Sequence, residues 1–232
     1  MKILHVADLH ARRPWLDWVS SHAKDFDLIC IAGDLQDAFG DEGMHKQARW
    51  LSTWLVALPV PTIVCTGNHD WWQKDRRALD VYAEGGWLRM LERKGQIVAT
   101  DGGTAAVAGL TIASIGWNQP ADWPDQTDIV VCHAPPPATP VAGVDLVLRC
   151  APEQSDLWQA LRATPPRFYL CGHIHGPPKN SCWFPPGERR TLIFNPGCDF
   201  DSPEPYRWEI DTKRGLAIWH GTETDEVQIL EP

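Results

Sequence analysis

Short runs of aliphatic residues alternate with longer amphipathic segments along the chain. Short runs of Val, Ile and Leu bounded by turn residues are typical of buried strands, and apolar residues three or four positions apart are typical of helices. The pattern predicts strands over residues 2–7, 28–32, 62–65, 128–132 and 167–171. It predicts helices over residues 14–24, 44–58, 75–94 and 152–163. Strands and helices in this alternation indicate an α/β fold with a largely buried sheet.

The second half of the chain is richer in predicted strands than in helices. Apolar residues alternate over 96–115 and are interrupted by Gly-Gly and Gly, which favours an antiparallel meander. Further antiparallel strands are expected within 182–211, and the last over 216–220. The sequence contains no internal repeat, low-complexity segment or long linker. We therefore expect one domain over residues 1–232.

Five polar clusters each follow a predicted buried strand directly. They are Asp8-Leu9-His10, Gly33-Asp34, Gly67-Asn68-His69-Asp70, His133 and Gly172-His173-Ile174-His175. Because the carboxyl ends of the strands of an α/β sheet lie at one edge, residues distant in sequence can meet in a crevice there. The placement predicts that the five clusters form a single site.

The composition of these clusters indicates a metal site. Together they contain three Asp, one Asn and five His. This mixture of oxygen and nitrogen donors suits Mn²⁺, Zn²⁺ or Fe better than Ca²⁺ or an iron–sulfur cluster. Nine side chains exceed the needs of one ion, and a carboxylate such as Asp34 can bridge two ions about 4 Å apart. Two-metal sites of this kind bind phosphate esters.

The order of the motifs carries a family resemblance. DLH at 8, GD at 33, GNHD at 67, HAPP at 133 and GHIH at 172 resemble the calcineurin-like metallophosphoesterase superfamily. The segment NPG at 195–197 is similar to one in many small bacterial members, and Cys132 stands where some members have Gly. The resemblance runs from Asp8 to His175 and implies an α/β fold of the four-layer αββα sandwich type.

The resemblance also implies roles for individual residues. The first metal ion would be held by Asp8, His10, Asp34 and His175. The second would be held by Asp34, Asn68, His133 and His173, so that Asp34 bridges the two. A hydroxide between the metal ions would attack phosphorus, with His69 as the general acid for the leaving group. Asp70 would orient His69 and raise its pKa.

Charge restricts the choice of substrate. The chain has 21 Lys and Arg against 30 Asp and Glu, a net charge of −9 and a pI of about 5.4, which disfavours binding to nucleic acid. We expect an enzyme acting on a small phosphomonoester or phosphodiester, nucleotides among them, with two divalent ions of Mn, Fe or Zn. The alternatives are a nuclease or protein phosphatase of the same superfamily, or a metal-free interaction scaffold. Loss of metal ligands would indicate a scaffold, and none is lost here.

The cysteines and the absence of targeting segments predict a cellular location. Seven cysteines occur without a CxxC pair, secretory leader or transmembrane stretch, which indicates a reduced, cytoplasmic compartment without a membrane partner. Four lie in or beside apolar runs and are expected to be buried: Cys30, Cys65, Cys132 and Cys171. Cys182 and Cys198 flank a possible hairpin and could approach each other.

For several further residues, the sequence allows both a functional and a structural role. Arg12 and Arg13 are expected to be solvated loop charges rather than phosphate ligands. Trp71 and Trp72 either form an aromatic wall of the site or pack in the core. Asn118 is favoured as a turn residue over a cleft residue. Structural or surface roles are expected for His5, His22, His45, His220, Trp50 and Trp54.

Overall fold

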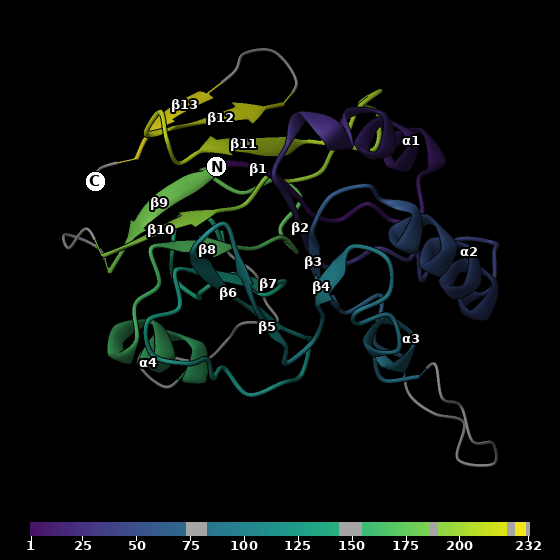
Figure 1. The fold of residues 1–232 in the computed structure, drawn as a ribbon, viewed down its shortest axis with the longest axis horizontal. Coiled ribbons are helices and arrows are strands. Elements are labelled where there is room, and N and C mark those ends of the chain that lie inside the picture. The colour runs from purple at the N-terminus through teal and green to yellow at the C-terminus, as the bar shows by residue number, and fades with distance from the viewer. Residues whose placement is uncertain (73–82, 144–154, 186–189, 222–225, 231–232) are drawn as a thin grey trace.

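The computed structural model describes residues 1–72, 83–143, 155–185, 190–221 and 226–230 (Figure 1). We call its seven-stranded sheet the first sheet. The strand order is β13 (Glu226–Ile229), β12 (Leu216–His220), β11 (Arg207–Asp211), β1 (Lys2–Val6), β2 (Leu28–Ala32), β3 (Thr62–Cys65) and β4 (Ile97–Ala99). Neighbouring strands from β1 to β4 pair in parallel, whereas β11 pairs antiparallel with β1. The carboxyl ends of β1, β2 and β3 therefore share one edge.

The second sheet has six strands. Their order is β5 (Thr104–Val107), β6 (Leu110–Ile115), β7 (Ile129–Cys132), β8 (Phe168–Leu170), β10 (Thr191–Phe194) and β9 (Ser181–Phe184). Pairing is parallel from β6 through β7 and β8 to β10, and the edge strands β5 and β9 are antiparallel to their neighbours. All residues of the central strands β7 and β8 are buried, which explains their continuous apolar sequence.

The two sheets pack face to face between helices, as Figure 1 shows. The helices α1 (Arg13–His22), α2 (Met44–Ala57) and α3 (Gly86–Arg89) cover the first sheet, and α4 (Asp156–Ala163) covers the second. One apolar cluster lies between the sheets and includes Cys30 and Phe168. Two others lie under the helices, around Trp15 and around Tyr169. The architecture is the expected αββα sandwich.

Most of the predicted elements are confirmed within one or two residues. The main error is the helix predicted over 75–94. Its part at 75–82 lies outside the described residues, and in the part that follows only Gly86–Arg89 is α-helical. Gly85, with a φ of 72°, precedes this short helix, and Gly95 lies at a φ of 57° beyond it. The left-handed Gly85 directly before the helix sets where it begins.

The predicted meander at 96–115 is divided between the two sheets. Strand β4 pairs in parallel with β3 of the first sheet, and β5 and β6 form a hairpin in the second. The chain crosses from one sheet to the other at 101–103, where Asp101 is followed by two glycines. Strand β13 was not predicted, and it pairs with β12 at the edge of the first sheet.

The described cysteines are free thiols, and Cys150 lies outside the described residues. The four expected to be buried are buried: Cys30, Cys65, Cys132 and Cys171. Cys182 lies on β9, whereas the Sγ of Cys198 contacts the backbone oxygen of Asp8 at 3.6 Å. These two cysteines form no disulfide bond with each other.

Candidate metal centre

The five polar clusters converge at the carboxyl ends of strands from both sheets. The loops after β1, β2 and β3 supply Asp8, His10, Asp34, Asn68, His69 and Asp70. The loops after β7 and β8 of the second sheet supply His133, His173 and His175. The two packed sheets thus bring together residues that are far apart in sequence, such as Asp8 and His175, whose side chains lie 3.5 Å apart.

Two motif glycines allow these loops to approach closely. A Cβ atom on Gly67 would overlap the carboxylate of Asp34. A Cβ atom on Gly172 would lie 2.7 Å from Oδ2 of Asp8. A side chain at either position would displace a carboxylate of the site. Only glycine therefore fits at Gly67 of GNHD and at Gly172 of GHIH.

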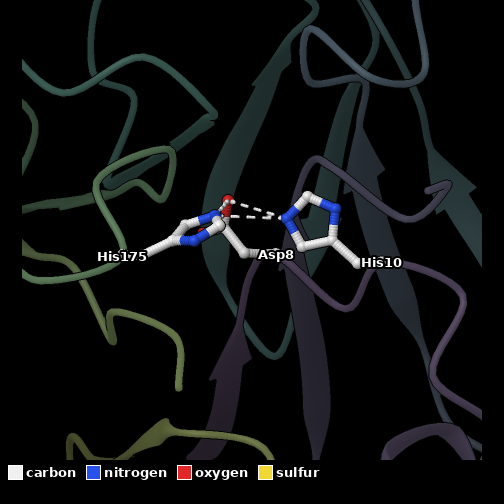
Figure 2. Close-up of side chains that lie close together, drawn as sticks. All are labelled: Asp8, His10 and His175. Carbon is white, nitrogen blue, oxygen red and sulfur yellow. Dashed lines mark hydrogen bonds and ion pairs between the residues drawn. The ribbon is translucent and has the colours of Figure 1, made fainter. Parts of the chain in front are cut away.

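The first group of possible metal ligands consists of Asp8, His10 and His175. Figure 2 shows the Asp8 carboxylate between the two imidazole rings. Nε2 of His175 lies 3.5 Å from Oδ1 of Asp8, and Nε2 of His10 lies 4.0 Å from the same oxygen. The two Nε2 atoms are 3.2 Å apart. Three donor atoms, two from the loop after β1 and one from the loop after β8, therefore face one point.

The second group is formed by Asp34, Asn68, His133 and His173. Nε2 of His133 lies 3.3 Å from Oδ2 of Asp34 and 3.2 Å from Oδ1 of Asn68. Nδ1 of His173 lies 2.9 Å from the same Asn68 oxygen. Donor atoms of Asp8, Asp34 and His133 lie within 4.8 Å of one another, so the two groups are adjacent.

Asp34 lies where the two groups meet. Its carboxylate is within 4.8 Å of donor atoms of His10 and His69 on one side and of Asp8 and His133 on the other. Its Oδ1 also accepts a hydrogen bond from the backbone N–H of His69 at 2.8 Å. This bond fixes the orientation of the carboxylate. The Asp34 carboxylate therefore lies close to donor atoms of both groups.

The hydrogen bonds of His133 test whether a cation fits here. Its Nδ1 lies 2.7 Å from the backbone oxygen of Ala32, which can only accept, so Nδ1 carries the hydrogen. In the neutral ring, Nε2 then presents a lone pair toward the oxygens of Asp34 and Asn68. Lone pairs facing one another are stabilised by a positive charge between them. The buried donor set therefore fits a metal ion.

The pKa of His133 reflects the negative charge of the surrounding carboxylates. Burial by itself opposes protonation, but the nearby carboxylates of Asp34 and Asp8 raise the pKa of His133 to about 9. Conversely, although burial opposes ionisation, the imidazoles of His133 and His69 lower the pKa of the Asp34 carboxyl. A site that holds a proton on a buried imidazole in this way also attracts divalent cations.

The backbone is strained at several of these residues. Positive φ angles occur at Asp8 (54°), His10 (43°), Asp34 (50°) and His173 (70°). Non-glycine residues rarely adopt this left-handed conformation, and such residues cluster at functional sites. Four donor residues therefore keep an unfavourable conformation that aims their side chains into the centre.

His69 lies beside the centre with one ring nitrogen already occupied. Its Nδ1 accepts the backbone N–H of Ala38 at 3.1 Å. The hydrogen of the neutral ring is therefore on Nε2, which lies 3.9 Å from Oδ2 of Asp34. The His69 side chain is 13% exposed, so Nε2 can donate a hydrogen bond to a bound molecule.

Asp70 contacts backbone groups rather than the His69 ring. Its carboxylate accepts N–H groups of Leu35, Gln36 and Gly67 at 2.9 to 3.1 Å. The direct pairing of Asp70 with the imidazole of His69, expected from the sequence, does not occur among the described contacts. The partner of His69 Nδ1 is Ala38, in the loop after β2 whose first residues Asp70 holds.

The other residues with two candidate roles are mostly structural. Arg12 packs over the rings of Trp15 and Phe200, and Arg13 packs over Trp50. Trp72 joins the apolar cluster beneath the helices of the first sheet, together with Trp50 and Trp54. Trp71 is partly buried. Asn118 lies in a left-handed turn, with a φ of 62°, and also lines a pocket.

The four remaining histidines lie outside the candidate ligand groups. His5 is buried within β1, and His22 contacts Trp18 in α1. His45 lies against the ring of Trp72, and His220, at the end of β12, pairs with Glu209 of β11. None of them belongs to the groups of possible metal ligands among the described residues.

Sequence reasoning missed three aromatic residues beside the centre. The ring of Phe39 contacts His69, and the ring of Phe200 contacts both His10 and His175. The ring of Trp117 contacts His133 and His173. Trp117 follows the buried strand β6, so it has the same strand-end placement that identified the polar clusters.

Comparisons with known proteins agree with this site. The family model described as calcineurin-like phosphoesterase matches residues 1–177, a range that contains all the candidate ligands. The chain belongs to this family of calcineurin-like phosphoesterases and is a metal-dependent phosphoesterase. No similar sequence was found among curated proteins.

Similar solved structures have low sequence identity to this chain, and the first of those below shares its fold. The purple acid phosphatase PPD1 from yellow lupin seeds is 11% identical, with a TM-score of 0.59 over 99% of this chain and 51% of that one. This chain thus spans about half the length of the lupin enzyme. A metallophosphoesterase from Sphaerobacter thermophilus is 16% identical, with coverage of 96% and 89% and a TM-score of 0.46. Yfce, a phosphoesterase from E. coli, is 13% identical, with coverage of 94% and 91% and a TM-score of 0.45.

The described helices were also compared with the length and hydropathy of membrane spans. None of them is both long enough and apolar enough to cross a bilayer.

Proposed function

We propose that this protein is a dinuclear metal-dependent phosphoesterase that hydrolyses small phosphomonoesters or phosphodiesters, nucleotides among them. The observation that carries the proposal is the position of Asp34, whose carboxylate is close to donor atoms of both ligand groups. A carboxylate in this position can bridge two metal ions that lie a short distance apart. The acidic composition of the chain agrees with a small substrate rather than a nucleic acid.

The two ions would have overlapping ligand sets. The first set is Asp8, His10, Asp34 and His175, and the second is Asp34, Asn68, His133 and His173. This mixture of carboxylate, amide and imidazole suits Mn, Fe or Zn. When bound, two such ions neutralise charge on the phosphate oxygens and make a water molecule acidic enough to serve as the nucleophile.

His69 would assist the leaving group. Because Nδ1 accepts the N–H of Ala38, the Nε2–H is free to donate a hydrogen bond to the oxygen that departs from phosphorus. This hydrogen bond stabilises the charge that develops on that oxygen, or transfers the proton to it. The effect is largest for alkoxides, which are poor leaving groups, and small for nitrophenolate.

Asp70 would act on His69 through the backbone. Its three hydrogen bonds fix the loop after β2 relative to the GNHD turn, and Ala38 of that same loop donates to His69. Burial and the neighbouring charge of Asp34 raise the pKa of Asp70 to about 7, and the three N–H donors counteract this effect. Asp70 is accordingly a positioning residue.

Metal removal and reloading test the proposal. The protein would be treated with a chelator, reloaded with Mn²⁺ and assayed with p-nitrophenyl phosphate and bis(p-nitrophenyl) phosphate. We expect hydrolysis to disappear on chelation and return on reloading, with two metal ions per chain by elemental analysis. Activity that survives complete metal removal would contradict the proposal, and one ion per chain would contradict its dinuclear form. Failure of the reloaded protein to hydrolyse any ester would favour the interaction scaffold.

A further inference from the structure

A pocket of about 240 Å³ opens beside the second ligand group. We call it the Trp117 pocket, and its principal lining residues are Trp117, Asn118, His133, Ala134, Ser155 and Asp156. They come from the ends of β6 and β7 and from the start of α4. Because pockets for drug-sized ligands have volumes of about 300 to 1,000 Å³, this smaller pocket suits a single small group.

The Trp117 pocket adjoins the metal centre directly. His133, a candidate metal ligand, forms part of its wall. The ring centroid of Trp117 lies 5.7 Å from that of His133 and 5.4 Å from that of His173. One molecule can therefore place a phosphate at the second ligand group and another of its chemical groups inside the pocket.

Trp117 is held rigidly at the pocket. Its backbone N–H lies 2.9 Å from Oγ1 and 3.2 Å from the backbone oxygen of Thr66. Thr66 in turn donates its N–H and its hydroxyl to the buried carboxylate of Asp101, each at 2.8 Å. This network fixes the backbone of the pocket wall before any ligand binds, which lowers the entropic cost of binding.

Several polar groups of the pocket are not used in hydrogen bonds among the described residues. The side chains of Asn118 and Ser155 and the indole N–H of Trp117 make no hydrogen bond to another described residue. An amide, a hydroxyl and an indole N–H provide both donors and acceptors. Asp156 adds a carboxylate acceptor, and no lysine or arginine is among the described lining residues. The pocket therefore disfavours an anionic group and suits an uncharged ring with donor and acceptor atoms.

We propose that the Trp117 pocket binds the base of a nucleoside phosphate whose phosphate lies at the metal centre. The indole of Trp117 supplies a flat apolar surface, and Asn118 supplies an amide that can pair with the ring heteroatoms. A base is a flat, uncharged ring with donors and acceptors at its edge, so its chemistry matches that of the pocket. This inference rests on the proposed function, because the metal centre must hold the phosphate.

Inhibition by nucleotides and by a sugar phosphate isolates the contribution of the base. Initial rates of bis(p-nitrophenyl) phosphate hydrolysis would be measured with AMP, GMP, CMP, UMP or ribose 5-phosphate as competitor. Stacking of a base on an aromatic side chain contributes about 1 to 3 kcal/mol. We accordingly expect at least one nucleotide to inhibit about 10-fold or more strongly than ribose 5-phosphate. Equal inhibition by all five compounds would overturn the inference.

Two variants place the effect at this pocket. In Trp117→Leu, the inhibition constant of the nucleotide should rise until it is close to that of ribose 5-phosphate. The inhibition constant of ribose 5-phosphate should stay within about 2-fold of its wild-type value. Asn118→Gly removes the amide and suits the φ of 62°, and it should weaken nucleotide inhibition selectively. Trp50→Leu, at a partly buried tryptophan under the opposite helical layer, is the control and should retain the nucleotide preference. Equal weakening of all competitors by Trp117→Leu would contradict the inference.

Calorimetry separates this inference from the proposed function. Adenosine, guanosine, cytidine, uridine and ribose would be titrated into the Mn²⁺-treated protein and into the Trp117→Leu variant. Binding of a nucleoside but not of ribose, lost in the variant, supports the pocket even if no ester is hydrolysed. Hydrolysis of p-nitrophenyl esters without any difference between nucleosides and ribose, or between nucleotides and ribose 5-phosphate, leaves the proposed function intact and overturns the inference.

Discussion

Nε2 of His133 lies 3.3 Å from Oδ2 of Asp34, and both side chains are buried. Since Nδ1 of His133 donates to the backbone oxygen of Ala32, the atoms that face each other are both acceptors unless a positive charge lies between them. The contact thus links the hydrogen bonding of one strand end to the cation affinity of the whole centre.

Asp34→Asn should abolish hydrolysis and reduce the metal content below two ions per chain. The neutral amide cannot supply the negative charge that two cations share, although it has nearly the same shape and the fold should be retained. Elemental analysis and circular dichroism would check metal content and fold. Asp41→Asn, at an exposed position, is the matched control and should keep both ions. Two ions per chain in Asp34→Asn would show that this residue does not bridge them.

His69→Ala should keep its metal ions but hydrolyse esters more slowly. General acid assistance typically contributes about 10² to 10⁴ in rate, so kcat for alkyl phosphate esters should fall by that factor. Esters of p-nitrophenol should be affected much less, because nitrophenolate departs without a proton. His22→Ala, in α1, is a control that should not change the ratio of the two rates. An equal loss for both classes of ester would argue against a role at the leaving group.

Gly67→Ala should weaken metal binding more than it destabilises the fold. Its Cβ atom would overlap the Asp34 carboxylate, which must then move away from His133. Titration with Mn²⁺ should show a raised dissociation constant, and activity at saturating metal should be partly restored. The control is Gly43→Ala, where a Cβ atom meets nothing within 4 Å. Unchanged metal affinity in Gly67→Ala would mean that the loops accommodate the methyl group.

Acid should destabilise the protein in part through His5. Burial lowers the pKa of His5 from 6.5 to about 4, while its Nε2 lies 3.0 Å from the backbone oxygen of Cys171. Between these pH values the unfolded chain binds a proton that the folded protein does not, so the free energy of unfolding decreases as the pH falls from 6.5 to 4. The full difference corresponds to about 3 kcal/mol.

The test compares the metal-free wild type with metal-free His5→Gln. Glutamine does not titrate and can donate a hydrogen bond to the Cys171 oxygen. Urea unfolding at several pH values from 7 to 4 should show a smaller loss of stability in the variant. Parallel curves for the two proteins would indicate that His5 titrates normally in the folded state.

Much of the site could be predicted from strand-end placement alone. Asp8, Asp34 and His133 each follow a short apolar run, and the carboxyl ends of such strands meet in α/β folds. The contact of Trp117 with His133 could not be predicted, because it depends on how the loop after β6 folds against Thr66. The same holds for Phe39 and Phe200, which lie in loops without a periodic pattern.

The outcome for Asp70 has a similar origin. Its position beside His69 in GNHD favours a direct pairing, but adjacent residues of a turn point in different directions. The backbone N–H groups of Leu35 and Gln36 come from another strand end and meet the Asp70 carboxylate only in the folded chain. Local sequence therefore identified an important carboxylate but not the backbone groups that it contacts.

The sequence by itself determined the family, the αββα class and the residues that converge on the metal centre. The candidate ligands follow from the apolar runs and the residues at their ends, whereas the family and the αββα class follow from the resemblance that the ordered motifs carry. Only the tertiary structure decided that Asp34 lies between the two ligand groups, that Ala38 sets the tautomer of His69, and that a pocket opens beside Trp117. These features depend on the packing of the two sheets and on backbone contacts between distant loops, which no local pattern of side chains encodes.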